Sequence, residues 1–306
     1  MRLKIRHETI YGFETPPSSV VQTLRLTPRS FDGQHIVRWR LDVDRNCRLR
    51  ASEDAFGNLT HVFMVEGPLD SLAVLVEGEV DTQDVNGVVR GAAERFPPPL
   101  YLRETDLTTP DLDIQVFAAD ATAGASDPLD RLHRLLSAVH ETVAFDPEGN
   151  EAAATAAEAF GLKRGVAQDL AHVFLAAARR LGAPARFVTG YLNLESLKAE
   201  AAAAQDQSGQ EQAQSMTAPA AEAQEKPSPR DPGHVWAEAH VPGLGWVGFD
   251  PVLGLCVTEA HVRVAIGLDH LGAAPARGSR YGGVGEELTV KISVENAGAR
   301  RISRRL

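Results

Sequence analysis

The stretch that decides the fold is Gly165-Val-Ala-Gln-Asp-Leu-Ala-His172, which predicts a loop followed by the first turn of a helix. Gly161 and Gly165 flank the turn. An amphipathic pattern begins at once and predicts a helix that ends at Gly182, before Pro184. Its apolar face consists of Leu170, Ala171, Phe174, Ala178 and Leu181. A second stretch, Gly233-His-Val-Trp-Ala-Glu238, leads through Pro242-Gly243 into Gly245-Trp-Val-Gly-Phe-Asp250 and predicts two strands joined by a tight turn.

Together, the two stretches predict the frame of a nucleophile–histidine–aspartate site. A helix N-terminus favours a cysteine thiolate because its unpaired backbone N–H groups and its dipole stabilise negative charge. Position 167 has this setting but holds alanine. His234 could take and return a proton, and Asp250 could fix the tautomer of the imidazole. The two residues lie on consecutive strands, whose side chains can meet across a ladder.

Each of these residues also has an ordinary structural interpretation. His240 continues the alternation of the His234 strand and is a competing candidate on periodicity. His172 could be a packed or a surface residue of its helix, and Asp250 before Pro251 could simply begin a turn. Cys256 follows Asp250 on the strand side and does not open a helix, so we expect a structural cysteine there.

The N-terminal part of the chain has the period of β-structure. Asp54-Ala-Phe-Gly-Asn58 predicts a hairpin turn between two alternating runs. We therefore expect an antiparallel β domain over residues 1–96, arranged as a sandwich. The apolar positions that alternate with polar ones are Val37, Trp39, Leu41 and Val43, and then Leu72, Val74, Val76 and Val80.

Residues 97–127 are rich in turn formers and predict a linker, after which the period becomes helical. Helices are expected from Asp127-Pro128, from Glu151 to Phe160 and from near Ala167. Strands follow at 185–192, 234–241, 245–250 and 261–266, and a last run at 288–294 is expected to close this second domain. The core over 128–296 is thus α+β, with helices before strands. It holds an Ala-, Gln-, Glu- and Ser-rich insertion at 195–230 and is followed by a basic tail at 297–306.

Composition argues against several classes of protein. The formal net charge is −10, which gives no basic footprint for nucleic acid. The two cysteines, Cys47 and Cys256, argue against a disulfide framework or a cysteine-based metal site, and no acidic cluster has calcium-loop spacing. The first residues lack the apolar core of a signal peptide, and no stretch approaches the roughly 20 apolar residues of a membrane span. We expect a cytoplasmic protein without a cofactor or metal.

Four motifs in order resemble the bacterial transglutaminase-like superfamily, and the N-terminal β half is similar to the region that precedes the core in such proteins. The motifs are Gly165-Val-Ala-Gln-Asp-Leu-Ala-His172, Arg180-Leu-Gly-Ala-Pro-Ala-Arg-Phe-Val-Thr-Gly-Tyr191, His234-Val-Trp-Ala-Glu238 and Gly243-Leu-Gly-Trp-Val-Gly-Phe-Asp-Pro251.

The resemblance implies a papain-like core that acts on amide bonds of a peptide or protein through an acyl-thioester, with water or an amine as acceptor. By position, Ala167 occupies the nucleophile site, His234 is the general base and acid, and Asp250 orients it. Gln168, Asp169 and Trp236 fall near the substrate and the oxyanion. The chain departs from the family's Gly-Val-Cys-Gln-Asp at Ala167, and it has Val252-Leu253 where the family often has Thr-Asn.

Alanine has no lone pair for attack, so the chain is predicted to be inactive by the family mechanism. Two origins of Ala167 are consistent with the sequence. Either the alanine replaced a cysteine by design, or the protein is a natural pseudoenzyme that binds a peptide or protein. The intact His234 and Asp250 favour the first, and the sequence leaves both open.

Overall fold

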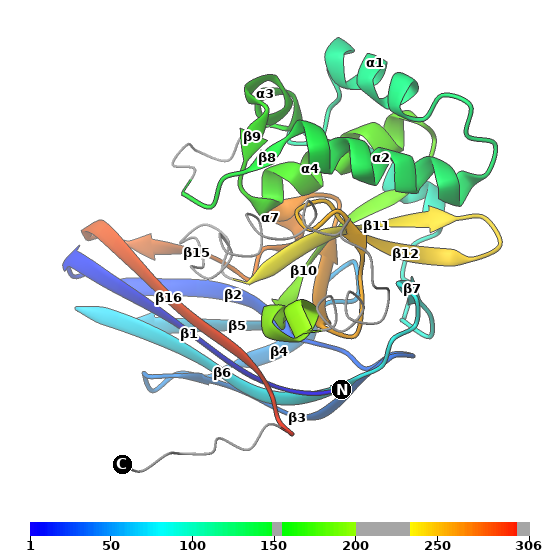
Figure 1. Ribbon diagram of the computed structural model, residues 1–306. Coiled ribbons are helices and arrows are strands. Elements are labelled where there is room, and N and C mark those ends of the chain that lie inside the picture. Colours follow the sequence, from blue (N-terminus) through cyan, green and yellow to red (C-terminus); the bar gives the residue numbers. More distant parts are fainter. Residues whose placement is uncertain (149–154, 200–232, 299–306) are drawn as a thin grey trace, which may run out of the picture.

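The computed structural model describes residues 1–148, 155–199 and 233–298. Helices cover one face of a central antiparallel sheet, and a β-sandwich lies on the other side (Figure 1). The predicted α+β architecture, with an antiparallel β region before a papain-like core, is confirmed. Among the described residues, no helix is long and apolar enough to cross a membrane.

The sandwich consists of two four-stranded sheets with the orders β16-β1-β6-β3 and β15-β2-β5-β4. Its strands alternate as the sequence predicts: in β1, Leu3 and Ile5 are buried, whereas Lys4 and Arg6 are exposed. Most buried apolar positions of the two sheets meet in one core, whereas Leu3 and Ile5 pack in a second cluster with Tyr191 and Val262. The strands of the N-terminal part are β1 (Arg2–Thr15), β2 (Ser19–Thr27), β3 (Gln34–Val43), β4 (Arg50–Glu53), β5 (Leu59–Glu66) and β6 (Ser71–Thr82).

The end of the chain completes the sandwich, which the sequence analysis did not foresee. We expected the run at 288–294 to close the second domain. Instead, β16 (Val284–Asn296) pairs with β1, and β15 (Ala276–Tyr281) pairs with β2. Alternation shows that a strand has one buried face, but it does not show which sheet the strand joins. The sandwich therefore uses 2–82 together with 276–296.

The core sheet has the order β13-β12-β11-β10-β14, and the short β7 (Val88–Val89) pairs with β12. Helix α4 packs against both β10 and β11. The other strands are β10 (Ala185–Leu192), β11 (His234–Val241), β12 (Gly245–Asp250), β13 (Leu255–Cys256) and β14 (His261–Gly267), and β8 (Ala144–Phe145) and β9 (Arg164–Gly165) form a separate parallel pair. The helices are η1 (Pro98–Leu102), α1 (Leu112–Ala121), α2 (Pro128–Thr142), α3 (Ala156–Leu162), α4 (Ala167–Arg180) and α7 (His270–Ala273).

Helix boundaries follow the sequence signals where caps are present. Asp127 accepts hydrogen bonds from the backbone N–H groups of Leu129 and Asp130, with Pro128 in the first turn, as predicted. Helix α1 lies within the stretch expected to be a linker. It buries only Ile114 and Ala118 among its ten residues, so it has no clear helical periodicity to detect.

Three expectations fall partly on residues outside the described ranges. Helix α3 is described from its N-cap Thr155 onward, so the expected start at Glu151 lies outside. In the insertion expected at 195–230, residues 194–199 are helical, and 200–232 lie outside. Of the basic tail at 297–306, residues 299–306 lie outside.

The sandwich docks on β14, the edge strand of the core sheet, through two side-chain amides. Gln34 donates to the carbonyl of Arg263 and accepts from its N–H, both at 2.8 Å. Asn58, at the end of the predicted hairpin turn, makes the same pair of bonds to Ile266, also at 2.8 Å. These amides take the place of a neighbouring strand, so the backbone N–H and C=O groups of Arg263 and Ile266 at the edge of the core sheet have protein partners.

Candidate active site

Helix α4 begins in a tight turn that the sequence 165–169 builds. The Asp169 carboxylate accepts a hydrogen bond from the Val166 backbone N–H at 3.0 Å and so closes the first turn. A Cβ on Gly165 would lie 2.7 Å from the Cβ of Asp169, so glycine is required beside this carboxylate. Ala167 is the first residue of the helix and is 5% exposed. The predicted helix N-terminus is thus present, and the methyl group of Ala167 lies in its first turn.

Topology brings this helix start to the same end of the layer as His234. Helix α4 and β10 are joined by the short turn 181–184, so they run in opposite directions, and β11 is antiparallel to β10. Helix α4 and β11 therefore begin at the same end. Ala167 and Val235 belong to one apolar cluster.

His234 and Asp250 form a buried hydrogen-bonded pair. The Nε2 of His234 lies 2.5 Å from an Asp250 carboxylate oxygen. His234 is the first residue of β11 and Asp250 the last of β12, and their side chains meet just beyond Ala237–Phe249, the last pair of the antiparallel ladder between these strands. Since Asp250 engages Nε2, Nδ1 is the ring nitrogen that could exchange a proton with a reacting group.

The Asp250 carboxylate is held on its other oxygen by the backbone. Oδ1 accepts from the N–H groups of Val252 and Leu253, at 3.0 and 3.1 Å. Backbone groups make these contacts, so the departure from Thr-Asn at these positions leaves them intact. Burial by itself would raise the pKa of Asp250, but the contacts with His234 and His261 outweigh it and hold the pKa below the usual range. The carboxylate is therefore an anion at neutral pH.

Sequence reasoning missed His261, the first residue of β14. Its Nε2 lies 3.3 Å from the same oxygen of Asp250 that contacts His234. The only sequence signal was a histidine at the start of a strand, and that strand is three elements away from the His234 strand along the chain. Its closeness to Asp250 depends on β14 pairing with β10 at the far side of β11.

The alternative histidines lie elsewhere. His240 is near the opposite end of β11, where its ring contacts Trp246 at a centroid distance of 5.3 Å. His172 is fully buried, and its Nε2 accepts from the His270 backbone N–H at 3.0 Å. Burial lowers the pKa of His172 to about 3. Neither residue contacts Asp250 within the hydrogen bonds of the described chain.

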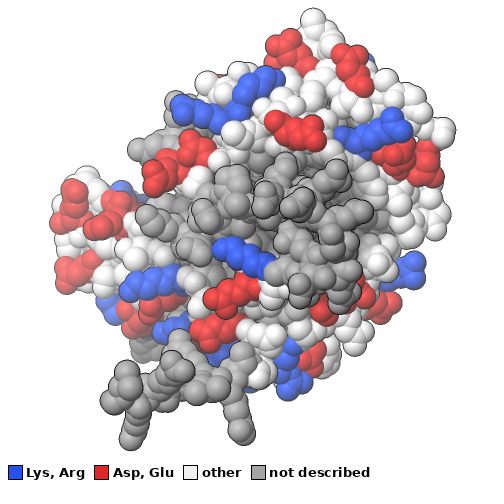
Figure 2. Space-filling model, viewed as in Figure 1, with Lys and Arg blue, Asp and Glu red and all other residues white. Residues whose placement is uncertain are grey.

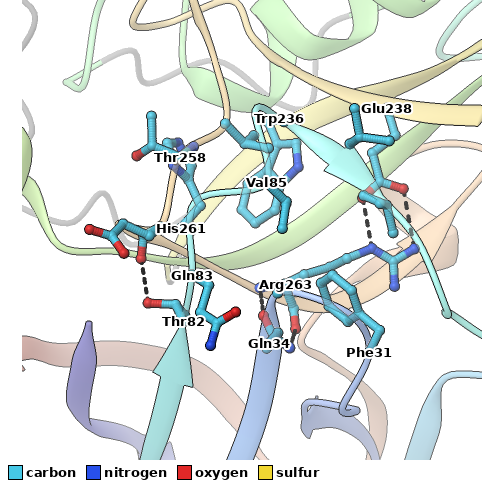
Figure 3. Close-up of a pocket in the computed structure, with 16 residues that line it drawn as sticks. Phe31, Gln34, Thr82, Gln83, Val85, Trp236, Glu238, Thr258, His261 and Arg263 are labelled. Carbon is cyan, nitrogen blue, oxygen red and sulfur yellow. Dashed lines mark hydrogen bonds and ion pairs between the residues drawn. The ribbon is translucent and has the colours of Figure 1, made fainter. Parts of the chain in front are cut away.

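The remaining predicted site residues are buried, and Trp236 contacts the pair. Gln168 and Asp169 lie in the first turn of α4. Trp236 contacts both imidazoles, with ring centroids 6.1 Å from His234 and 5.4 Å from His261. It also lines a cavity of about 40 Å³ between the sandwich and the core, together with His261 (Figure 3).

Cys256 does not replace the missing thiol. Its Sγ lies 3.4 Å from Nε2 of His133 on α2. Burial raises the pKa of this thiol to about 11, so it is protonated at neutral pH. Both cysteines are free.

His234, Asp250 and His261 could be considered as metal ligands, because their ligand atoms lie within 4.8 Å of one another. The hydrogen bonds argue against this use. The Thr258 backbone N–H donates to Nδ1 of His261 at 3.1 Å, so the neutral ring carries its proton on Nε2, the nitrogen that a metal would need. The group fits a hydrogen-bonded chain rather than a metal site.

An ion network lies further along β11. The fully buried Glu238 accepts from Arg186 Nε at 2.6 Å. It also accepts from Arg263 Nε and Nη2, at 2.7 and 3.2 Å (Figure 3). Arg186 also pairs with Glu94 at 2.7 Å and stacks on Trp246, with 3.9 Å from Cζ to the ring centroid. This network joins three strands of the core sheet beneath the sandwich.

An antiparallel sheet covered by helices, with a histidine–aspartate pair at the end where the central helix begins, defines a papain-like core. Comparisons with known proteins agree. The family model for the bacterial transglutaminase-like N-terminal region matches residues 3–81, and that for the transglutaminase-like superfamily matches residues 115–251. The chain belongs to the transglutaminase-like superfamily.

Similar proteins cover almost the whole chain. An uncharacterized protein of Mycobacterium leprae is 23% identical over 96% of this chain and 98% of its own, and one of Mycobacterium tuberculosis is 23% identical over 96% and 92%. A crystal structure from Cytophaga hutchinsonii, provisionally described as a cysteine protease, has a TM-score of 0.68 at 18% identity and covers 97% of this chain and 91% of that chain. At this identity the likeness shows the fold.

Proposed function

We propose that this chain has the frame of a cysteine amidase, peptidase or acyl transferase that acts on peptide amide bonds, and that Ala167 prevents turnover. The observation that supports this proposal is the buried His234–Asp250 pair at 2.5 Å, at the end of the sheet where α4 begins. A pair of this kind has the proton-transfer and orienting roles that a helix-borne thiol needs.

With a cysteine at position 167, the steps would be as follows. The thiolate attacks the amide carbonyl carbon, and backbone N–H groups at the start of α4 stabilise the oxyanion. The C–N bond then breaks, and the protonated Nδ1 of His234 gives its proton to the leaving amine. Water or a second amine then attacks the thioester carbonyl carbon while His234 takes its proton. The C–S bond breaks, the acyl group leaves as a carboxylic acid or a new amide, and the thiolate is restored beside the protonated His234. Asp250 stabilises the imidazolium in each step.

Ala167 removes the first of these steps. In subtilisin, loss of the nucleophile costs about a millionfold in kcat. We therefore expect no turnover by this route in the chain as it stands.

The test restores the thiol with Ala167→Cys in a background that carries Cys47→Ser and Cys256→Ser. We expect iodoacetamide to alkylate the new thiol below pH 7, because the helix N-terminus and His234 favour the thiolate. We also expect hydrolysis of a glutamine-bearing peptide or its coupling to a labelled primary amine. The matched control adds His234→Asn, which should slow both reactions.

Failure of the restored thiol to react faster than an ordinary thiol, with no amide chemistry, would refute the enzyme proposal. The parent chain with Ala167 serves as the blank for both assays.

The second candidate is a natural pseudoenzyme that binds a peptide or protein without cleaving it, and the alanine at position 167 is the observation that supports it. Binding would then persist in His234→Ala, because it would not need proton transfer. Loss of peptide affinity in that variant would count against this candidate.

The proposed partner is a peptide or protein, and neither nucleic acid nor a membrane. Acidic and basic side chains are interspersed on the face of the molecule in Figure 2, which supports this choice over a phosphate-binding surface. A cytoplasmic location is part of the proposal and is supported by the two free cysteines.

A further inference from the structure

We infer that His261 is a positioning residue, which holds the Asp250 carboxylate in the orientation that engages His234. The observation is that two imidazole Nε2 atoms, of His234 and His261, lie at 2.5 and 3.3 Å from one Asp250 oxygen. The consequence for catalysis rests on the proposed role of His234, whereas the hydrogen-bond arrangement itself does not.

The protonation of His261 follows from its other ring nitrogen. Nδ1 accepts the Thr258 backbone N–H at 3.1 Å, so it must be unprotonated. Burial lowers the pKa of His261 despite the opposing effect of Asp250, so the ring is neutral. A neutral ring with an unprotonated Nδ1 has its hydrogen on Nε2, and that hydrogen points to Asp250. His261 is thus a donor to the carboxylate.

With this donor, both oxygens of Asp250 have two partners each. Oδ1 accepts the N–H groups of Val252 and Leu253, and Oδ2 accepts from the two imidazoles. The carboxylate is fully buried, and four donors fix its rotation about the Cβ–Cγ bond. Because Oδ2 is shared, His261 also determines how strongly that oxygen accepts from His234.

The sandwich braces the turn that presents His261. Residues 258–261 form a turn closed by a hydrogen bond from the His261 N–H to the Thr258 carbonyl at 3.2 Å. Thr82, the last residue of β6 in the sandwich, donates its hydroxyl to the Glu259 carbonyl at 2.6 Å (Figure 3). The sandwich therefore contacts the turn that holds the third partner of the histidine–aspartate pair.

The competing explanation is that His261 is an ordinary buried histidine with satisfied nitrogens. Both explanations predict that its loss lowers stability, so stability does not separate them. They differ in what happens to the hydrogen bond between His234 and Asp250, which only a donor to the same oxygen would alter.

The test compares His261→Gln with His261→Met in the chain as it stands. The two replacements have similar size, but Gln retains an N–H donor at the distance of Nε2 and Met has none. The readout is the proton NMR resonance of the His234 Nε2–H, assigned by its loss in His234→Asn. We expect Met to move this resonance upfield, because a carboxylate that has lost one of its four donors is held less firmly toward His234, and Gln to leave it close to that of the parent chain.

Equal resonances in the Met variant and the parent chain would overturn the inference, as would equal shifts in Met and Gln. Should the Met variant not fold, Thr82→Val is the second test, because it removes the hydrogen bond from the sandwich to the Glu259 carbonyl. We expect a smaller shift of the His234 resonance in the same direction, and no shift would refute the inference.

In the Ala167→Cys background, we expect alkylation by iodoacetamide to be about tenfold slower with His261→Met than with His261→Gln, since a hydrogen bond to a charged group has about this effect. An unreactive thiol together with a shifted His234 resonance would refute the proposed function and leave the positioning role intact.

Discussion

Replacing Glu238 with glutamine should destabilise the protein more than any comparable change on its surface. The substitution keeps the size of the side chain but removes the charge that Arg186 and Arg263 share. It also turns an amide NH₂ group toward a guanidinium. The fully buried Arg186 and the partly buried Arg263 then lose the anion that they share.

The size of the expected loss in stability depends on the contacts that the two arginines keep. Breaking a buried ion pair by removing one partner costs about 3–5 kcal/mol. Arg186 keeps its two bonds to Glu94, at 2.7 and 3.1 Å, so the lower end of this range applies. We expect a loss of about 3 kcal/mol in the free energy of unfolding, which for a chain of this size lowers Tm by about 5 °C. Urea unfolding followed by circular dichroism measures the first quantity, and calorimetry the second.

The matched control is Glu77→Gln. Glu77 pairs with Arg6 on the outer face of the sandwich, where the two side chains are 51% and 46% exposed. The same chemical change there should cost less than about 1 kcal/mol, because water screens the pair. Equal losses for the two variants would refute the argument from burial.

The pH dependence gives a second check on Glu238. Burial alone would raise its pKa, but the guanidinium groups of Arg263 and Arg186 lower it to about 2. A carboxyl with a lowered pKa contributes stability that is present above its unfolded pKa and is lost as the pH falls toward its folded pKa. The difference between the parent chain and Glu238→Gln should therefore shrink between about pH 4.5 and pH 2. A difference that stays constant over this window would contradict the assignment.

Two further substitutions test local features of the fold. Gly165→Ala places a Cβ 2.7 Å from that of Asp169 and should lower the free energy of unfolding by about 1–3 kcal/mol, because this position is overpacked. The control Gly161→Ala meets nothing within 4 Å and should be neutral or stabilising, so similar urea midpoints for the two variants would be evidence against the tight helix start. Asn58→Ala leaves the N–H and C=O of Ile266 without partners at the sandwich interface and should cost about 2–4 kcal/mol in urea unfolding, and a loss below 1 kcal/mol would show that this docking contact is dispensable.

Much of the histidine–aspartate site could be predicted from local sequence. His234 and Asp250 lie on adjacent strands joined by a tight turn, so their spacing in the chain nearly fixes their spacing in space. The start of α4 follows from Gly165, the following amphipathic run and Gly182, each of which acts on its immediate neighbours. That the start of α4 and the His234–Asp250 strands belong to one site was supported by the family resemblance.

His261 could not be predicted in this way. Its contact with Asp250 needs β14 to pair with β10, an order that neither composition nor period reveals. The same holds for Gln34 and Asn58, because no local sequence pattern shows which strand edge a side-chain amide will bind.

The sequence by itself determined most of the longer strands and helices, though not α1, and placed a histidine beside an acid, because periodicity, caps and tight turns act over a few residues. It also determined that position 167 has no nucleophile. Only the tertiary structure decided that β15 and β16 return to the sandwich and that Asp250 has a second imidazole partner. These contacts join residues far apart in the chain, and their partners are selected by the packing of whole sheets rather than by any local preference.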